Sequence, residues 1–302
     1  MTTTPSPVAA PNTAPSPGAG PATVGIHAPG AMGTALARCL RAGGYEVATT
    51  AAGRSPATAR RLADAGLPDA GSVDAVVAAA AVVISVVPPG LARDAAAELA
   101  AACRRTGARP LVVEANAVAP DTVTVIAADL PTALVDAAIS GPPPDPGSAH
   151  PTRIFLAGER ADEVAALVVP GVTWVGLGPT PGAASAAKMC TASVRKGFVG
   201  LLAQALVTAE HHDVLDAVLT DLRLDFPAAG AGPAAAAATK AWRFVDEMTA
   251  IADTQAGAGL TRELFDGFAQ VYRDLATSEY GDRRPEDLPD APDVGKLRPR
   301  RG

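Results

Sequence analysis

The chain has 302 residues, of which 48% are hydrophobic and 19% charged, so it holds enough apolar side chains for two packed domains. Its net charge of −6 excludes a strongly basic surface, and we expect neither a nucleic acid nor an anionic membrane as partner. Pro or Gly interrupts the apolar runs before they reach the roughly 18 residues that a membrane-spanning helix needs. Three widely spaced cysteines without a CxxC pair fit a reducing, cytoplasmic location.

The first 22 residues are rich in Pro, Thr and Ala and carry neither the cationic start nor the apolar run of a secretory signal. We expect residues 1–22 to form a disordered tail. Beyond them, short aliphatic runs alternate with alanine-rich helical stretches, a rhythm typical of a parallel, doubly wound sheet. Strands are expected over residues 23–28, 46–50, 81–87, 110–115, 133–138, 153–157 and 172–175, and the clearest helices over 31–42 and 55–65. Residues 23–180 therefore predict an α/β domain of the Rossmann type.

The pattern changes after Gly182, because no strand signal returns. Helices are expected over residues 183–211, 214–222, 233–255 and 260–279. Residues 181–279 therefore predict an all-α domain. The charged, proline-rich stretch over residues 280–302 is expected to be a second flexible tail.

The segment VGIHAPGAMGTALARCL reads as an apolar strand, a tight turn and a helix. Gly30 and Gly33 stand where a dinucleotide-binding fingerprint has its second and third glycines, and Ala28 takes the place of the first. A helix that begins after this turn directs free N–H groups and its positive dipole end at a pyrophosphate. The expected contacts are Pro29, Gly30, Ala31, Met32 and Gly33. The alternative is a tight turn whose glycines serve packing only.

The cofactor preference depends on the residues after the second strand, where NAD-binding sites supply an acidic side chain to the ribose hydroxyls. No Asp or Glu lies between Ala48 and Thr58, whereas Arg54 and Ser55 open the next helix and suit a 2′-phosphate. The sequence therefore favours NADP over NAD. An ordinary solvated surface arginine is the alternative for Arg54.

Six landmarks in chain order make the sequence resemble the 3-hydroxyacid dehydrogenase superfamily, which includes 3-hydroxyisobutyrate and 6-phosphogluconate dehydrogenases and, more distantly, imine reductases. They are AxGAMG at residues 28–33, GRS at 53–55, VISVVPP at 83–89, EANAVAP at 114–120, DAAISGPPP at 136–144 and GAASAAKMC at 182–190. The stretch KAWRFVDEMTAIADTQAGAGL at residues 240–260 is similar to a phosphogluconate dehydrogenase-like C-terminal domain of unassigned function. That last likeness concerns the fold and names no substrate.

The resemblance implies roles for several further residues. Val87 and Pro88 would lie beside the cofactor, and Asn116 near the nicotinamide ribose. The substrate would meet Ser140, Gly141 and Pro142. The resemblance also implies a homodimer with the active site near the subunit interface.

Lys188 corresponds to the catalytic lysine of these relatives. It is one of only four lysines and lies among Ala, Gly, Met and Cys, where a solvated charged face is not expected. A lysine in such surroundings loses its proton more readily, which suits a general acid–base group near neutral pH. The alternative is a lysine that extends from an apolar helix to water.

Two positions depart from the family pattern. Pro142 replaces a second glycine and, with the two prolines after it, removes three N–H donors. Ala192, one helical turn after Lys188, replaces an asparagine of many relatives. The first hypothesis is an NADP-dependent oxidoreductase acting on a small hydroxyacid, oxoacid or related carbonyl compound. Reduction of a C=N bond by an imine or natural-product reductase is the second. A non-catalytic NADP-binding sensor is the third, and the retained Lys188 argues against it.

Two features receive simpler interpretations. Arg243 and Glu247, four residues apart on an expected helix, are read as an intrahelical ion pair next to core residues, and the alternative is that this turn borders the pocket. The four histidines lack metal-binding spacing, so we expect no metal.

Overall fold

A computed structural model describes residues 22–300, so almost the whole tail expected over residues 1–22 lies outside the described part. The chain forms two compact units. The sheet unit runs up to Val87 and then takes in residues 94–115 and 127–181. The helical unit comprises everything from Gly182 onward together with two short segments, residues 88–93 and 116–126, which the sequence pattern did not assign to it.

The sheet unit is built on seven strands in the order β2-β1-β3-β4-β5-β6-β7. Their bounds are β1 Thr23–His27, β2 Glu46–Thr49, β3 Val82–Ser85, β4 Leu111–Glu114, β5 Leu134–Ser140, β6 Thr152–Ala157 and β7 Val172–Gly176. Each lies within two residues of an expected strand at either end. The prediction of a Rossmann-type α/β fold followed by helices is confirmed.

One strand departs from the parallel arrangement that we expected. β6 pairs antiparallel with β5, with Ala138 opposite Phe155. Residues 141–151, which connect the two strands, contain no helix. Because a parallel neighbour needs a crossover connection, usually helical, a chain without one turns back beside the strand it has left. The sheet is therefore mixed.

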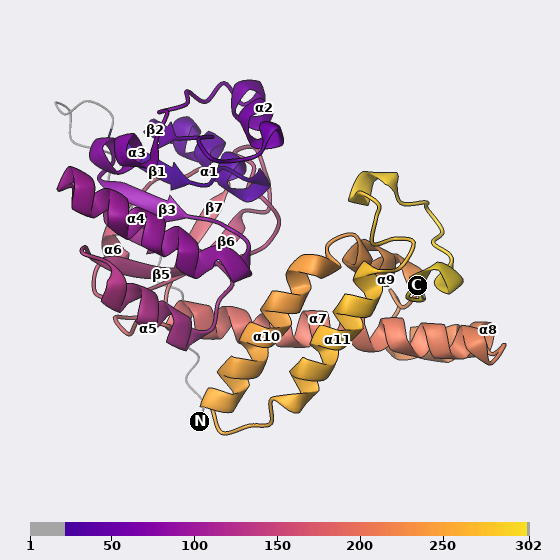
Figure 1. Cartoon of the computed structure of the whole chain (residues 1–302). Coiled ribbons are helices and arrows are strands. Elements are labelled where there is room, and N and C mark those ends of the chain that lie inside the picture. Colours follow the sequence, from indigo (N-terminus) through magenta and orange to yellow (C-terminus); the bar gives the residue numbers. More distant parts are fainter. Residues whose placement is uncertain (1–21, 301–302) are drawn as a thin grey trace. The chain divides into compact units, whose positions relative to one another are not determined.

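Helices cover both faces of this sheet (Figure 1). Their bounds are α1 Ala31–Ala42, α2 Pro56–Asp64, α3 Val73–Ala79, α4 Ala92–Thr106 and α6 Ala161–Ala165. The 3₁₀ turn η1 (Pro89–Leu91) and most of α5 (Pro120–Asp129) fall in the two segments that belong to the helical unit. Leu36 and Leu40 of α1 share one buried cluster with Ile26 of β1 and Val164 of α6. After β2 the strand order continues on the other side of β1, so a right-handed crossover places α4 on the face opposite α1.

The helical unit consists of α7 Ala183–His211, α8 Leu215–Asp225, α9 Ala231–Ala238, α10 Ala241–Gly257 and α11 Glu263–Ala276 (Figure 1). Its core brings together Met189 of α7, Met248 and Ile251 of α10, and Tyr272 of α11. The helix expected over residues 233–255 is divided in two at Thr239, whose hydroxyl donates to the Ala236 carbonyl and so competes with continued helix. No helix among residues 22–300 combines the length and apolar character needed to cross a membrane.

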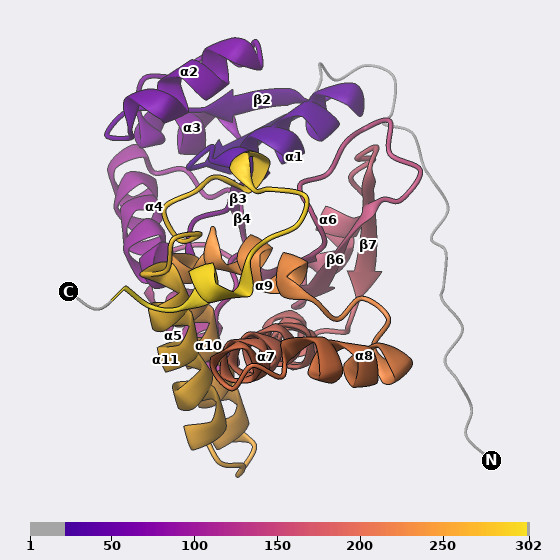
Figure 2. The same cartoon turned by 90° about the vertical axis from the view of Figure 1, so that its right-hand side faces the viewer.

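The segment after α11 differs from the flexible tail that we expected over residues 280–302. Tyr280 and Leu297 are each only 1% exposed, and the Asp293 amide donates to the Tyr280 hydroxyl at 2.7 Å. The 3₁₀ turn η3 (Val294–Leu297) contacts α7 and α9, and a further 3₁₀ turn, η2, spans Pro285–Asp287. Figure 2 shows this part of the chain in yellow. Two buried apolar side chains that pattern reasoning overlooked, Val294 and Leu297, attach it to the helical unit.

Candidate functional site

The residues expected to hold a dinucleotide follow the carboxyl ends of neighbouring parallel strands. The turn from Pro29 to Gly33 follows β1, Arg54 and Ser55 follow β2, and Val87 and Pro88 follow β3. β1 lies between β2 and β3, so the chain adds strands first on one side of β1 and then on the other. A crevice at such a switch point is where open α/β sheets bind ligands.

The turn after β1 fits a dinucleotide pyrophosphate. Gly30 begins α1 with no side chain capping the helix, and a Cβ added to it would meet no atom within 4 Å. A Cβ on Gly33 would lie 3.1 Å from Cγ2 of Ile26, so this glycine allows helix and strand to pack closely. Ala28 has a φ of 61°, a left-handed conformation that costs an alanine roughly 1–2 kcal/mol. The backbone thus keeps the conformation of a glycine fingerprint even where the glycine is absent.

Arg54 lies beside two residues, Glu98 and His27, that the local sequence did not connect with it. Its Nη2 donates to Oε2 of Glu98, on α4, at 2.8 Å. Nε2 of His27, the last residue of β1, lies 2.9 Å from the same oxygen and 3.2 Å from Arg54 Nη2. Burial lowers the pKa of His27, and Glu98 opposes this effect. Because a carboxylate oxygen only accepts, Nε2 of His27 is the donor in its hydrogen bond to Glu98. Glu98 stands 44 residues from Arg54 and left no signal in the sequence around β2.

Ser55 caps the N-terminus of α2. Its Oγ accepts a hydrogen bond from the Thr58 amide at 3.4 Å. The preceding Gly53 has a φ of 70°, and a Cβ there would meet nothing within 4 Å. The turn therefore leaves room beside Arg54 for a ligand.

The predicted substrate loop begins where β5 ends. Ser140 is the last residue of β5, and Gly141 and Pro142 after it are exposed. The Thr152 hydroxyl donates to the Pro142 carbonyl at 2.8 Å, and its Cγ2 would lie 3.2 Å from a Cβ on Gly141. Thr152 thus fixes the loop, and only a glycine fits at position 141 without displacing it.

Lys188 and Asn116 both belong to the helical unit. Lys188 is half-buried in the second turn of α7, and one turn later Ala192 is 3% exposed. Ala117, next to Asn116, packs against the cluster that contains Met189 and Ala192. The asparagine that many relatives carry near the lysine is therefore replaced by a small apolar side chain within the core.

A second lysine of α7 was missed. Lys196 forms an ion pair with Glu247 of α10, and its Nζ lies 4.0 Å from the centroid of the Phe244 ring. Burial lowers the pKa of Lys196 to about 8, against the effect of Glu247, which raises it. The intrahelical pair expected between Arg243 and Glu247 is wrong, because Glu247 is directed to α7 and the Arg243 guanidinium lies over Trp242.

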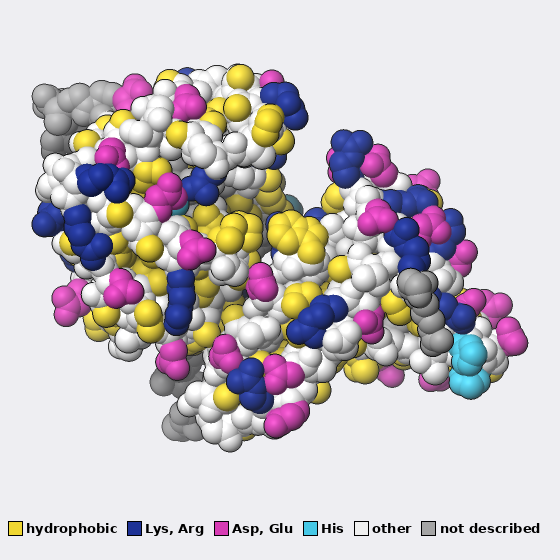
Figure 3. Space-filling view, viewed as in Figure 1, with side chains coloured by type: hydrophobic (Ala, Val, Ile, Leu, Met, Phe, Trp, Pro, Cys, Tyr) yellow, Lys and Arg dark blue, Asp and Glu magenta, His cyan; other side chains and the backbone are white. Residues whose placement is uncertain are grey.

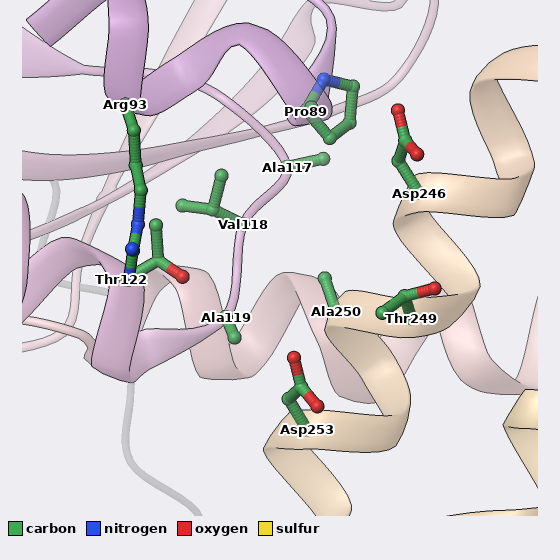
Figure 4. A pocket seen from close by; sticks show the side chains of 11 residues that line it. Pro89, Arg93, Ala117, Val118, Ala119, Thr122, Asp246, Thr249, Ala250 and Asp253 are labelled. Carbon is green, nitrogen blue, oxygen red and sulfur yellow. The ribbon is translucent and has the colours of Figure 1, made fainter.

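The helical unit also contains a cavity of about 260 Å³, shown in Figure 4. Asp246, Thr249 and Asp253 lie along α10 on one side, with Arg93 and Thr122 on the other. Of the predicted site residues, none lines this cavity.

No group of three or more His, Cys, Asp or Glu side chains within residues 22–300 is arranged to hold a metal ion. On the face shown in Figure 3, charges of both signs are interspersed over both units.

Comparison with protein families assigns a domain to each half of the chain. Residues 23–167 match the NAD binding domain of 6-phosphogluconate dehydrogenase. Residues 209–275 match a domain of unknown function, DUF1932. A comparison with curated proteins found no match.

Solved structures extend the likeness over both units. A conserved protein of unknown function, whose structure is described as similar to 3-hydroxyacid dehydrogenases, is 30% identical over 84% of this chain and 96% of its own, with a TM-score of 0.63. The Mycobacterium tuberculosis 3-hydroxyisobutyrate dehydrogenase, solved with L-serine, is 22% identical over 88% and 97%, with a TM-score of 0.66. A Streptomyces aurantiacus imine reductase shares the fold at 19% identity over 83% and 93%, with a TM-score of 0.53.

Proposed function

Because the chain belongs to the 3-hydroxyacid dehydrogenase family of NAD(P)-dependent oxidoreductases, we propose that it transfers a hydride between NADP and a small hydroxyacid, oxoacid or related carbonyl compound. The observation that carries the proposal is the arrangement of residues at the carboxyl ends of β1 and β2. There an open glycine turn and a cationic Arg54 follow adjacent parallel strands. This is the arrangement that pyrophosphate and 2′-phosphate recognition requires.

The proposal gives each predicted site residue a task. The N–H groups at the start of α1 hold the pyrophosphate, Arg54 and Ser55 hold the 2′-phosphate, and Val87, Pro88 and Asn116 flank the nicotinamide and its ribose. A nicotinamide held there would supply or accept the hydride. Ser140 and the Gly141 amide hold the substrate carboxylate or an equivalent acceptor group.

Lys188 is the proposed general acid–base. In oxidation it takes the proton of the substrate hydroxyl, and in reduction it returns that proton to the carbonyl oxygen. Its half-buried place on α7, among small and apolar side chains, supports the assignment. An ammonium group that shuttles a proton needs contact with both substrate and solvent, which a half-buried side chain allows.

Reduction of a C=N bond is the second candidate. Ala192 is buried where relatives present an asparagine, and Pro142 has no N–H to offer a carboxylate. Both features favour a less polar substrate than a small hydroxyacid. The imine reductase comparison is at the level of the fold and leaves the reacting bond open.

A substrate panel separates these candidates. The protein is mixed with NADPH and, in turn, 3-oxoacids, aldehydes and cyclic imines, and loss of nicotinamide absorbance is followed. Turnover of oxoacids supports the first candidate and turnover of imines the second. NADPH binding without turnover in any class would refute both.

Lys188→Ala is expected to abolish turnover and to leave the Kd for NADPH unchanged, and an unaltered kcat removes the acid–base assignment.

We also propose that the chain works as a cytoplasmic homodimer. An apolar stripe runs along α7 through Cys190, Val194, Phe198, Leu201 and Ala205, at the spacing of one helix face. Val194 and Leu201 are 72% and 61% exposed. A second copy of α7 is the proposed partner of this face, which we call the α7 stripe.

A further inference from the structure

The ion pair between Arg54 and Glu98 bears on which dinucleotide the proposed site accepts. Resting on the proposed function, we propose that Glu98 sets the cofactor selectivity of the chain by competing with a 2′-phosphate for Arg54. Glu98 stands on α4, far along the sequence from the turn that carries Arg54. The acid that appeared to be missing after the second strand is thus supplied in space by another element.

The geometry anchors the carboxylate from two sides. Arg54 Nη2 lies 2.8 Å from Glu98 Oε2, and Nε2 of His27 lies 2.9 Å from the same oxygen. His27 is 2% exposed, and within the described residues its Nδ1 has no hydrogen-bond partner. The buried ring thus gives the Glu98 carboxylate a second hydrogen-bond partner that is itself fixed inside the sheet unit. Glu98 is therefore more firmly positioned than a typical surface partner of an arginine, whose ion pair contributes about 0–1 kcal/mol.

The two cofactors meet this carboxylate differently. A 2′-phosphate has to share Arg54 with Glu98, and the two negative groups repel each other across a few ångströms. A 2′-hydroxyl, by contrast, donates to a Glu98 oxygen and accepts from Arg54. The site therefore accepts both NADP and NAD, and Glu98 limits the preference for NADP that Arg54 creates.

Dissociation constants of NADPH and NADH, measured by titration calorimetry on the full chain, test the inference. Glu98→Gln keeps the size and a hydrogen-bonding oxygen but removes the charge. We expect it to tighten NADPH binding by about tenfold, the effect of one removed charge in a partly exposed site. NADH binding is expected to stay the same or weaken. Glu98→Ala is a second variant with the same expected direction.

Asp94→Asn is the matched control, because Asp94 is exposed one turn earlier on α4 and its loss changes the net charge equally. It should leave the dissociation constants of NADPH and NADH within about twofold of their wild-type values, since a solvated charge at a greater distance is screened. An equal change for both cofactors in Glu98→Gln, or no change at all, overturns the inference. Arg54→Ala distinguishes failure of this inference from failure of the proposed NADP site. If Arg54→Ala weakens NADPH binding selectively and Glu98→Gln changes nothing, Arg54 keeps its role and only the role of Glu98 is refuted. If Arg54→Ala weakens NADPH and NADH binding equally, the 2′-phosphate site itself is refuted.

Discussion

The ammonium group of Lys196 on α7 has a lowered pKa in the folded chain. Burial lowers its pKa from 10.5 to about 8, the Glu247 carboxylate opposes the shift, and nearby Lys188 and Arg243 add to it. The folded chain therefore releases this proton near pH 8, whereas the unfolded chain keeps it to about pH 10.5. Between these pH values unfolding takes up a proton, so this group's contribution to the free energy of unfolding rises with pH.

We expect the stability of the wild-type chain, relative to Lys196→Met, to increase between pH 8 and pH 10.5. The gain should be about 1–3 kcal/mol, because each pKa unit corresponds to about 1.4 kcal/mol and the side chain is largely removed from water. Urea unfolding of both proteins at several pH values measures it. Lys240→Met, on a lysine at the start of α10, controls for the loss of a lysine as such. If the free energies of unfolding of wild type and Lys196→Met change with pH in parallel, the lowered pKa of Lys196 is contradicted.

Two glycines of α7 provide a matched test of how closely α7 and α11 pack. A Cβ on Gly197 would lie 3.5 Å from Phe268, an ordinary contact, whereas a Cβ on Gly200 would lie 2.9 Å from the same ring. Gly197→Ala should raise the free energy of unfolding by about 1 kcal/mol, because alanine is the better helix former. Gly200→Ala should instead lower it by about 1–3 kcal/mol, the usual cost of overpacking. Thermal and urea unfolding compare the two, and equal effects would mean that Phe268 moves aside freely.

Elements with a strong local pattern were predictable from the sequence. α7 was expected over residues 183–211 and occupies Ala183–His211, because alanine-rich helical sequence continues without a breaker. The division at Thr239 and the antiparallel β6 depend on hydrogen bonds and connections that periodicity does not encode. The same holds for the site. The glycine turn follows from local sequence, while Glu98 beside Arg54 and Glu247 beside Lys196 are meetings between distant elements.

At the scale of the whole molecule, the α7 stripe is the surface that we expect a second copy of the chain to cover. α7 has 29 residues and is therefore about 43 Å long, so two copies side by side can bury a continuous seam. Phe226 extends the apolar surface, since its ring centroid lies 5.0 Å from that of Phe198 on the stripe. Monomeric soluble proteins rarely leave a long contiguous apolar patch uncovered.

We expect light scattering after size-exclusion chromatography to give twice the chain mass of 30.1 kDa for the wild type. Leu201→Lys places an ammonium group in the middle of the stripe, where a partner subunit would have to bury it without a counter-charge, so the variant should elute as a single chain. Val125→Lys is the control, because Val125 is also an exposed aliphatic side chain, 42% exposed, but belongs to another helix, α5. It should keep the wild-type mass. A wild-type mass of one chain, or a Leu201→Lys variant that stays dimeric at low micromolar concentration, would show that this face of α7 does not join two copies.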